Sequence, residues 1–236
     1  MAQKKGIQFG KNIPSLVIFI AVVLVVVGGG LMVTKPALLF SGDGKEILSQ
    51  NYPGLNADEL ASYISAKTAF DAAKAKGSAW QSDALFISLD SKSVTWKGAA
   101  KSWDVVYASE KAKKTLHVEV DKSGVKQQYE GTGKDVSGYV QHLKDLVLDS
   151  PKILELVVKD GATAQYINQV LGDVNPEFIL YEKDELRTQS IYSESGKSEV
   201  LWKIVFKPVG AKSKGLAVWV DAQNGTVLSH EDVVIE

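Results

Sequence analysis

An uncharged run of 20 residues near the N-terminus, from Ser15 to Thr34, constrains this chain more than any other feature. Its centre, Leu16 to Val27, is almost purely aliphatic. Because an α-helix rises about 1.5 Å per residue, a helix of about 20 residues spans roughly the 30 Å hydrocarbon core of a bilayer. With its flanks included, the run predicts one transmembrane helix over residues 13–35.

The charges beside this helix predict its orientation. Lys4, Lys5 and Lys11 precede the run, and no acidic residue lies before it. Cytoplasmic flanks of membrane helices carry an excess of lysine and arginine, and Lys35 on the other side weakens this bias without reversing it. We therefore expect a single-pass protein of the cell membrane, with residues 1–12 in the cytoplasm and the C-terminal body outside.

A cleaved signal peptide is the alternative interpretation of the apolar run. The run is too long for that role, and no small-x-small pair sits where cleavage would occur. We therefore expect the helix to stay attached as an anchor. Its three glycines, Gly28, Gly29 and Gly30, are candidate contacts for a second membrane helix, since small residues let helices approach closely. They also fit a flexible end of the helix.

Composition narrows the role of the body. The formal net charge is −1, and removing the three N-terminal lysines leaves about −4 for the rest. An acidic body argues against nucleic acid as a partner, because phosphate binding needs a basic face. The absence of cysteine excludes disulfides, thiol nucleophiles and thiolate metal sites. A hydrophobic content of 45% is ordinary for a globular protein with a core.

Breaker residues and periodicity predict the elements of the body. Residues 36–54 form a linker with turn signals such as Pro53-Gly54, and Asn56 caps a helix that we expect to end at Gly77. Strands are expected at Leu85–Asp90, Val94–Trp96, Trp103–Ala108, Leu116–Asp121 and Val125–Glu130.

Helical spacing then returns before a second series of strands. Helices are expected at about Tyr139–Leu148, from Ser150-Pro151 onward, and at about Ala162–Leu171. Strands are expected at Phe178–Glu182, Ser190–Tyr192, Val200–Lys207, Leu216–Asp221 and Thr226–His230.

The two series repeat one another. Trp103-Asp-Val-Val-Tyr107 matches Trp202-Lys-Ile-Val-Phe206, and Leu116-His-Val-Glu-Val-Asp121 matches Leu216-Ala-Val-Trp-Val-Asp221. The fold class is therefore α+β, with two helix-plus-antiparallel-sheet units at residues 55–133 and 134–236. Because one unit is too small to bury both faces of its sheet, we expect the units to pack on each other.

The last hairpin carries a resemblance to the PepSY family, whose cystatin-like units contain a strand ending in Val-Asp-x-x-Thr-Gly-x-Val. The segment Val218-Trp-Val-Asp-Ala-Gln-Asn-Gly-Thr-Val-Leu228 is similar, with Asn224 in place of the usual threonine. The first unit, Val118-Glu-Val-Asp-Lys-Ser-Gly-Val125, is more divergent and one residue shorter. The layout also resembles small membrane-anchored regulators of cell-wall synthesis in Gram-positive bacteria. The motif itself indicates a turn, in which Asp221 accepts hydrogen bonds from turn amides.

The sequence offers no catalytic, cofactor-binding or metal-binding residues. His117, His142 and His230 lack ligand spacing, and no nucleophile or phosphate-loop motif is present. Glu182, Asp184 and Glu185 lie among residues of both charges, which is typical of a solvated turn. We therefore expect no enzyme and no cofactor.

Trp219 is the candidate partner contact of the body, if its sheet face is open; if that face is covered, the ring belongs to the core. The resemblance implies a non-enzymatic extracytoplasmic binding or regulatory module with a protein partner, such as an exported peptidase or a cell-envelope enzyme. The alternative is a structural or accessory subunit of a membrane complex or surface assembly, with Gly28–Gly30 in the interface.

Overall fold

A computed structural model describes residues 61–170, 174–187, 189, 191, 196–208 and 214–234. The predicted tail, transmembrane helix (13–35), linker (36–54) and Asn56 cap lie outside these residues. None of the described helices is long and apolar enough to cross a membrane.

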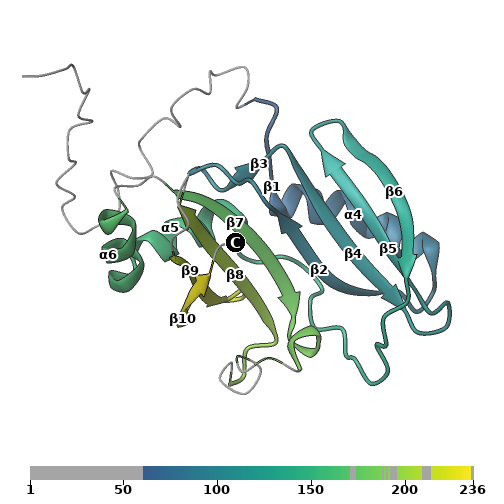
Figure 1. Cartoon of the computed structure of the whole chain (residues 1–236). Coiled ribbons are helices and arrows are strands. Elements are labelled where there is room, and N and C mark those ends of the chain that lie inside the picture. The colour runs from purple at the N-terminus through teal and green to yellow at the C-terminus, as the bar shows by residue number, and fades with distance from the viewer. Residues whose placement is uncertain are drawn as a thin grey trace, which may run out of the picture. The chain divides into compact units, whose positions relative to one another are not determined.

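The described elements form a mixed α+β fold (Figure 1). In chain order they are β1 (Ile64–Ser65), α4 (Ala66–Trp80), β2 (Leu85–Ser91), β3 (Ala99–Ala100), β4 (Ser102–Ser109), β5 (Lys114–Asp121), β6 (Gly124–Thr132), α5 (Ser150–Lys159), α6 (Gly161–Gln169), β7 (Val174–Glu182), the short 3₁₀ helix η1 (Lys183–Leu186), β8 (Val200–Pro208), β9 (Lys214–Asp221) and β10 (Val227–Val234).

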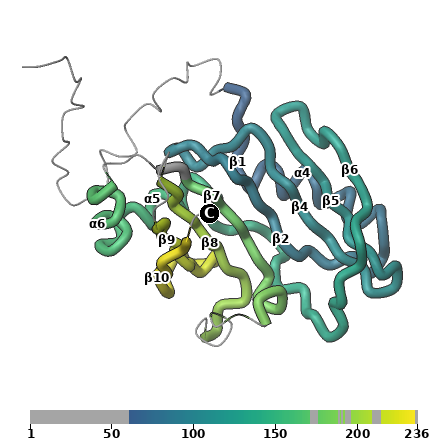
Figure 2. The backbone as a smooth tube through the Cα atoms, in the orientation of Figure 1, coloured from purple at the N-terminus to yellow at the C-terminus, as the bar shows by residue number. Residues whose placement is uncertain are grey.

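Within the described ranges, eight strands form one antiparallel sheet in the order β10-β9-β8-β7-β2-β4-β5-β6. The first half of the fold, residues 61–132, contributes β2, β4, β5 and β6, and the second half, residues 150–234, contributes β7 to β10. Each half is a meander that runs outward from the centre, where β2 pairs with β7 (Figure 2). The two halves are thus related by an approximate two-fold axis near the pair Asp90–Ile179.

The repeat predicted from the sequence occupies equivalent places in the sheet. Trp103 pairs with Val120 on the next strand, as Trp202 pairs with Val220. The halves do not stack face to face, however. They join edge to edge through β2 and β7 and share one core, because the helices of both halves cover the same face, here called the helix face.

Three aromatic rings mark the centre of this shared core. Trp103, Phe178 and Trp202 are fully buried on the helix face. The ring centroids of Trp103 and Trp202 are 6.5 Å apart, and Phe178 lies edge-on to both rings. Since Trp103 comes from one half and Trp202 from the other, burial of these rings holds the halves together.

The helix α4 packs its small residues closely on the first half of the sheet. The helix begins at Ala66 rather than directly after Asn56 as predicted, since Ile64 and Ser65 form β1. The Ser65 hydroxyl caps it by accepting from the Thr68 backbone N–H, and the helix runs past Gly77 to Trp80. Gly77 therefore does not end the helix as predicted. A Cβ at this position would lie 2.6 Å from the Tyr107 ring, so the glycine is required for close packing.

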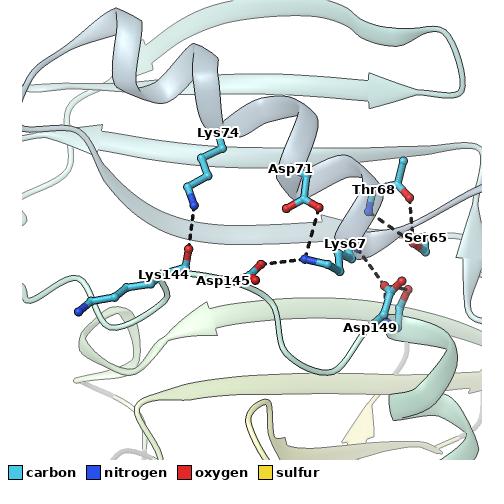
Figure 3. A network of polar contacts seen from close by, with 9 residues as sticks. Ser65, Lys67, Thr68, Asp71, Lys74, Lys144, Asp145 and Asp149 are labelled. Carbon is cyan, nitrogen blue, oxygen red and sulfur yellow. Dashed lines mark hydrogen bonds and ion pairs between the residues drawn. The ribbon is translucent and has the colours of Figure 1, made fainter.

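The crossover segment, residues 133–149, connects the halves without a helix. The helix predicted at Tyr139–Leu148 is wrong, and the segment takes an irregular path along α4 (Figure 3). There the Lys74 ammonium donates to the Lys144 carbonyl at 2.9 Å, and Lys67 pairs with Asp145 at 2.7 Å. The Lys67 backbone N–H donates to Asp149 Oδ1 at 2.9 Å, which joins the start of α4 to the start of α5.

We expect Asp149→Ala to lower the free energy of unfolding by about 2 kcal/mol, because it removes the acceptor of two backbone N–H groups. Those groups belong to Lys67 and Ser150. Chemical denaturation followed by circular dichroism measures the loss. Asp145→Ala is the control, since the Asp145–Lys67 pair is exposed and such pairs contribute little. An equal loss in both variants would contradict this role of Asp149.

The predicted hairpin turns are confirmed. Asp221 Oδ1 accepts from the backbone N–H groups of Gln223 (2.7 Å) and Asn224 (3.1 Å), and Gly225 takes a φ of +77°. Asp121 Oδ1 likewise accepts from the Ser123 N–H at 2.8 Å in the first half. The motif that resembles the PepSY pattern is therefore a turn motif in this chain.

Candidate binding face

The side of the sheet opposite the helices, here called the open face, carries a row of polar side chains in the first half. Asp90 on β2 lies opposite Asp104 on β4, which lies opposite Glu119 on β5, which lies opposite Gln127 on β6. Directly paired residues point to the same side of a sheet, with neighbouring Cβ atoms about 5 Å apart. Four consecutive strands therefore present one continuous polar row.

This row lines a shallow hollow of about 350 Å³ on the open face. The other residues of its lining are Ser91, Lys92, Ser102 and Tyr129. Tyr129 is 52% exposed, an unusual state for a large ring on a sheet. The hollow thus combines three carboxylates, two serine hydroxyls, an amide, one lysine and one accessible aromatic ring.

An imidazole ring orders the floor of the hollow. His117 Nδ1 lies 2.8 Å from Asp104 Oδ2, and its ring stacks on Tyr129 with the ring centroids 4.7 Å apart. The other carboxylate oxygen of Asp104 is shielded from solvent and has no hydrogen-bond partner among the described residues. The carboxylate and the tyrosine ring are therefore held in fixed places by one histidine.

Burial and like charges act together on Asp90. Burial, followed by the nearby carboxylates of Asp104 and Glu177, raises the pKa of Asp90 to about 6. Glu119 is in the opposite situation, because its hydrogen bond from Lys126 (2.9 Å) holds its pKa below the usual value. Asp90 therefore takes up a proton at a higher pH than Glu119 does.

This arrangement suits a cationic or aromatic group of a ligand better than an anionic one. Carboxylates supply charge-assisted acceptors, and the accessible face of Tyr129 supplies a surface for a cation or a second ring. In the described part of the chain, no three histidine or acidic side chains converge as metal ligands would.

The structure separates the three histidines and gives each a carboxylate partner. His117 pairs with Asp104, His142 Nδ1 lies 3.0 Å from Glu199, and His230 Nε2 lies 2.7 Å from Asp160. Asp160 is also the N-cap of α6. His142 and His230 therefore serve local structure.

The acidic group in and after β7 is not the solvated turn that the sequence suggested. Glu182 is 2% exposed and accepts from the backbone N–H groups of His142 (3.3 Å) and Leu143 (2.6 Å). Asp184 accepts from the Val140 N–H at 2.9 Å, and Glu185 pairs with Lys134. These carboxylates hold the crossover segment against the second half.

Trp219, a candidate contact if its sheet face is open and a core residue if that face is covered, is 3% exposed. It packs on the open face of the second half with Leu186, Ile191 and Leu201, and Lys203 lies over its ring. The ring therefore does not reach the surface of this chain. Gly28–Gly30 lie outside the described residues.

Glu119 occupies the position in the first half that Trp219 occupies in the second, since each lies one residue before the final valine of the repeated strand. The same strand position therefore lines the hollow in the first half and belongs to a hydrophobic cluster in the second. Asp90, Asp104 and Tyr129 were not among the candidates predicted from the sequence. The signal available for them was the polar set alternating with buried residues along β4 and β5.

Comparison with known proteins assigns no family to the chain. No family model and no curated protein matches it. It is similar to a solved structure described as a "putative lipoprotein" from Clostridium difficile 630, with 13% identity and a TM-score of 0.44, covering 71% of this chain and 94% of that chain.

Proposed function

We propose that this chain is a non-enzymatic binding module, anchored in the cell membrane, which holds a protein partner against the open face of its extracytoplasmic sheet. The observation that carries the proposal is the hollow formed by the polar row on that face. The helices of both halves cover the other face, so the hollow is not filled by the chain's own helices. The uncharged run Ser15–Thr34 and the lysines before it support the anchor.

The resemblance of the second hairpin to the PepSY family supports an exported peptidase or a cell-envelope enzyme as the partner. Binding through the hollow requires a partner segment with a cationic or aromatic side chain, because the row is acidic and Tyr129 is accessible. Addition of a partner strand to an outer edge, β6 or β10, is the other way in which a sheet of this kind recognises proteins.

Site-specific photocrosslinking in cells tests the face directly. A photoreactive residue at Tyr129 or Gln127 is expected to give a discrete adduct with one protein, because both side chains line the hollow. The matched control is Lys76, an exposed residue of α4 on the other side of the sheet. Adducts of equal yield from all three positions, or none from Tyr129 and Gln127, would rule out the open face.

A substitution at Tyr129 measures how much the hollow contributes to binding of the protein partner. We expect Tyr129→Ala to weaken recovery of the complex by about tenfold, as for a central aromatic contact. Tyr129→Phe keeps the ring that stacks on His117 and should bind nearly as well. Turnover of a peptide or glycan by the purified chain, without a partner, would contradict the non-enzymatic part of the proposal.

Replacing residues 13–35 with an unrelated apolar helix separates this function from that of a membrane-complex subunit. A binding module keeps its activity on any anchor, whereas a subunit that contacts its neighbours through Gly28–Gly30 loses it. Recovery of the same adduct at Tyr129 after the exchange is the result we expect.

A further inference from the structure

The joint between the two halves is the shortest ladder of the eight-stranded sheet, as far as the structure describes it. β2 and β7 pair over four residues each, Ser88–Ser91 with Phe178–Tyr181. By comparison, β4 pairs with β5 over eight residues and β7 with β8 over nine. This β2–β7 ladder is here called the seam.

Two hydrogen bonds through the Gln141 side chain link β7 to β2 beyond the last residue pair of the seam. Glu182 follows Tyr181 directly, and its carboxylate accepts from the Gln141 amide of the crossover segment. The Gln141 amide oxygen accepts in turn from the Phe86 backbone N–H of β2 at 2.6 Å. Glu182 therefore links β7 to β2 through a residue that belongs to neither strand.

The seam has a second carboxylate on its opposite side. Asp90 is one of the four paired residues of β2 and projects onto the open face, whereas Glu182 lies on the helix face. Among the described residues, neither carboxylate forms an ion pair. In the described part of the chain, two carboxylates without an ion-pair partner thus flank the shortest ladder of the sheet.

Asp90 lies among groups that disfavour its charge. For Glu182, burial and the nearby Asp184 disfavour the charge, and they act against three N–H hydrogen bonds, from Gln141, His142 and Leu143, that favour it.

The titratable groups around Asp90 are Asp104 on β4, Glu119 on β5, Tyr129 on β6, and Glu177 and Tyr181 on β7. Two further neighbours, Lys92 and His117, favour its charged form. Around Glu182 lie Asp184 and His142, and the His142 ring is engaged by Glu199.

We propose that the seam is a pH-sensitive joint, which holds the two halves together most firmly when Asp90 and Glu182 are protonated and loosens as they ionise. The proposal goes beyond the binding function and does not depend on it.

The direction of the pH dependence follows from the raised pKa values of the two carboxyl groups. Burial raises the pKa of Glu182 to about 7 and that of Asp90 to about 6, from their ordinary values of 4.5 and 3.8. The closed seam therefore binds these protons more tightly than an opened, solvated seam does. The stabilisation is complete below about pH 4 and is lost as the pH rises through about 6 to 7, so that opening increases on the order of tenfold between pH 6 and pH 8.

Hydrogen exchange of the full-length protein in detergent micelles, followed by mass spectrometry at pH 6 and pH 8, tests the proposal. Peptides over residues 86–91 and 177–182 report on the seam, and peptides over 103–108 and 116–121 report on the β4–β5 ladder as the internal reference. After correction for intrinsic exchange, the ratio of seam opening to reference opening should rise about tenfold from pH 6 to pH 8. An unchanged ratio, or an equal rise in all four peptides, would overturn the proposal.

Variants assign the effect to the two carboxylates. Asp90→Asn combined with Glu182→Gln should reduce the change of that ratio to less than twofold, since neither amide ionises. Glu155→Gln, at a partly exposed residue of α5 that pairs with Lys152, is the control and should keep the full change. Retention of the full pH dependence in the double variant would overturn the assignment. If the double variant does not fold, the single variants must each reduce the change.

Discussion

Replacement of Trp202 by alanine is expected to lower the free energy of unfolding by about 3–5 kcal/mol, the range found when a buried aromatic ring leaves a cavity. The ring is fully buried where both halves meet, in contact with Phe178 and Trp103. Its loss removes packing from both halves at once. Denaturant unfolding followed by far-ultraviolet circular dichroism measures the change.

Tyr129→Ala provides the control for the loss of an aromatic ring. Because this ring is half exposed on the open face, its removal should change the free energy of unfolding by no more than about 0.5 kcal/mol. By the repeat, Trp103→Ala should cost about as much as Trp202→Ala. If Trp202→Ala proved as mild as Tyr129→Ala, the shared core would not be the main support of the fold.

Gly98→Ala is expected to lower the free energy of unfolding by about 3 kcal/mol or more, because strain and overlap add together. Gly98 has a φ of +72°, and a Cβ there would lie 2.5 Å from the Pro151 Cα and 2.7 Å from the Ser150 carbonyl oxygen. The Gly98 carbonyl also accepts from the Ser150 hydroxyl at 2.6 Å. The new methyl group would therefore push the start of α5 away from the first half.

Gly124→Ala separates the effect of backbone strain from that of steric overlap. Gly124 also has a positive φ, of +105°, but a Cβ there would meet nothing within 4 Å. This variant should show the backbone strain alone, about 1–2 kcal/mol. Thermal unfolding of both variants beside the unmodified protein measures the difference, and equal losses would mean that contact with α5 contributes nothing at Gly98.

Local patterns in the sequence predicted most strands and turns. The alternation of Leu116, Val118 and Val120 places these residues on the buried side of β5 in the structure, as expected. Asp221 and Gly225 form the turn as their residue types predict, since the Asp221 carboxylate accepts from a turn N–H and Gly225 takes a positive φ. These features depend on neighbours in the chain, which is why one sequence suffices to predict them.

Features that depend on distant residues were not predicted. The segment 139–148 has helical spacing, but its backbone N–H groups at Val140, His142 and Leu143 donate to the carboxylates of Asp184 and Glu182. Those acceptors lie about 40 residues further along the chain, so local periodicity carries no information about them. Asp184 and Glu182 were misassigned to a solvated turn for the same reason.

The candidate binding face also depends on residues that are far apart in the sequence. Polar alternation along β4 and β5 indicates that one face is open, but it does not reveal that Asp90, from a strand earlier in the chain, completes the row. Nor does it show that the two halves join at their edges. Whether Trp219 faces a partner or the core stayed open at the level of sequence, because the repeat gave no reason to expect Leu186, Ile191 and Leu201 beside its ring.

The approximate two-fold axis has a consequence for how the two open faces came to differ. A pair of identical halves joined through β2 would present every surface residue twice, so any change on one side would be copied on the other. In a single chain the copies vary independently, and here Asp104 and Glu119 correspond to Lys203 and Trp219. One half has a polar recess, whereas the matching face of the other half is an aromatic surface covered by the chain itself, a difference that a symmetric dimer cannot have.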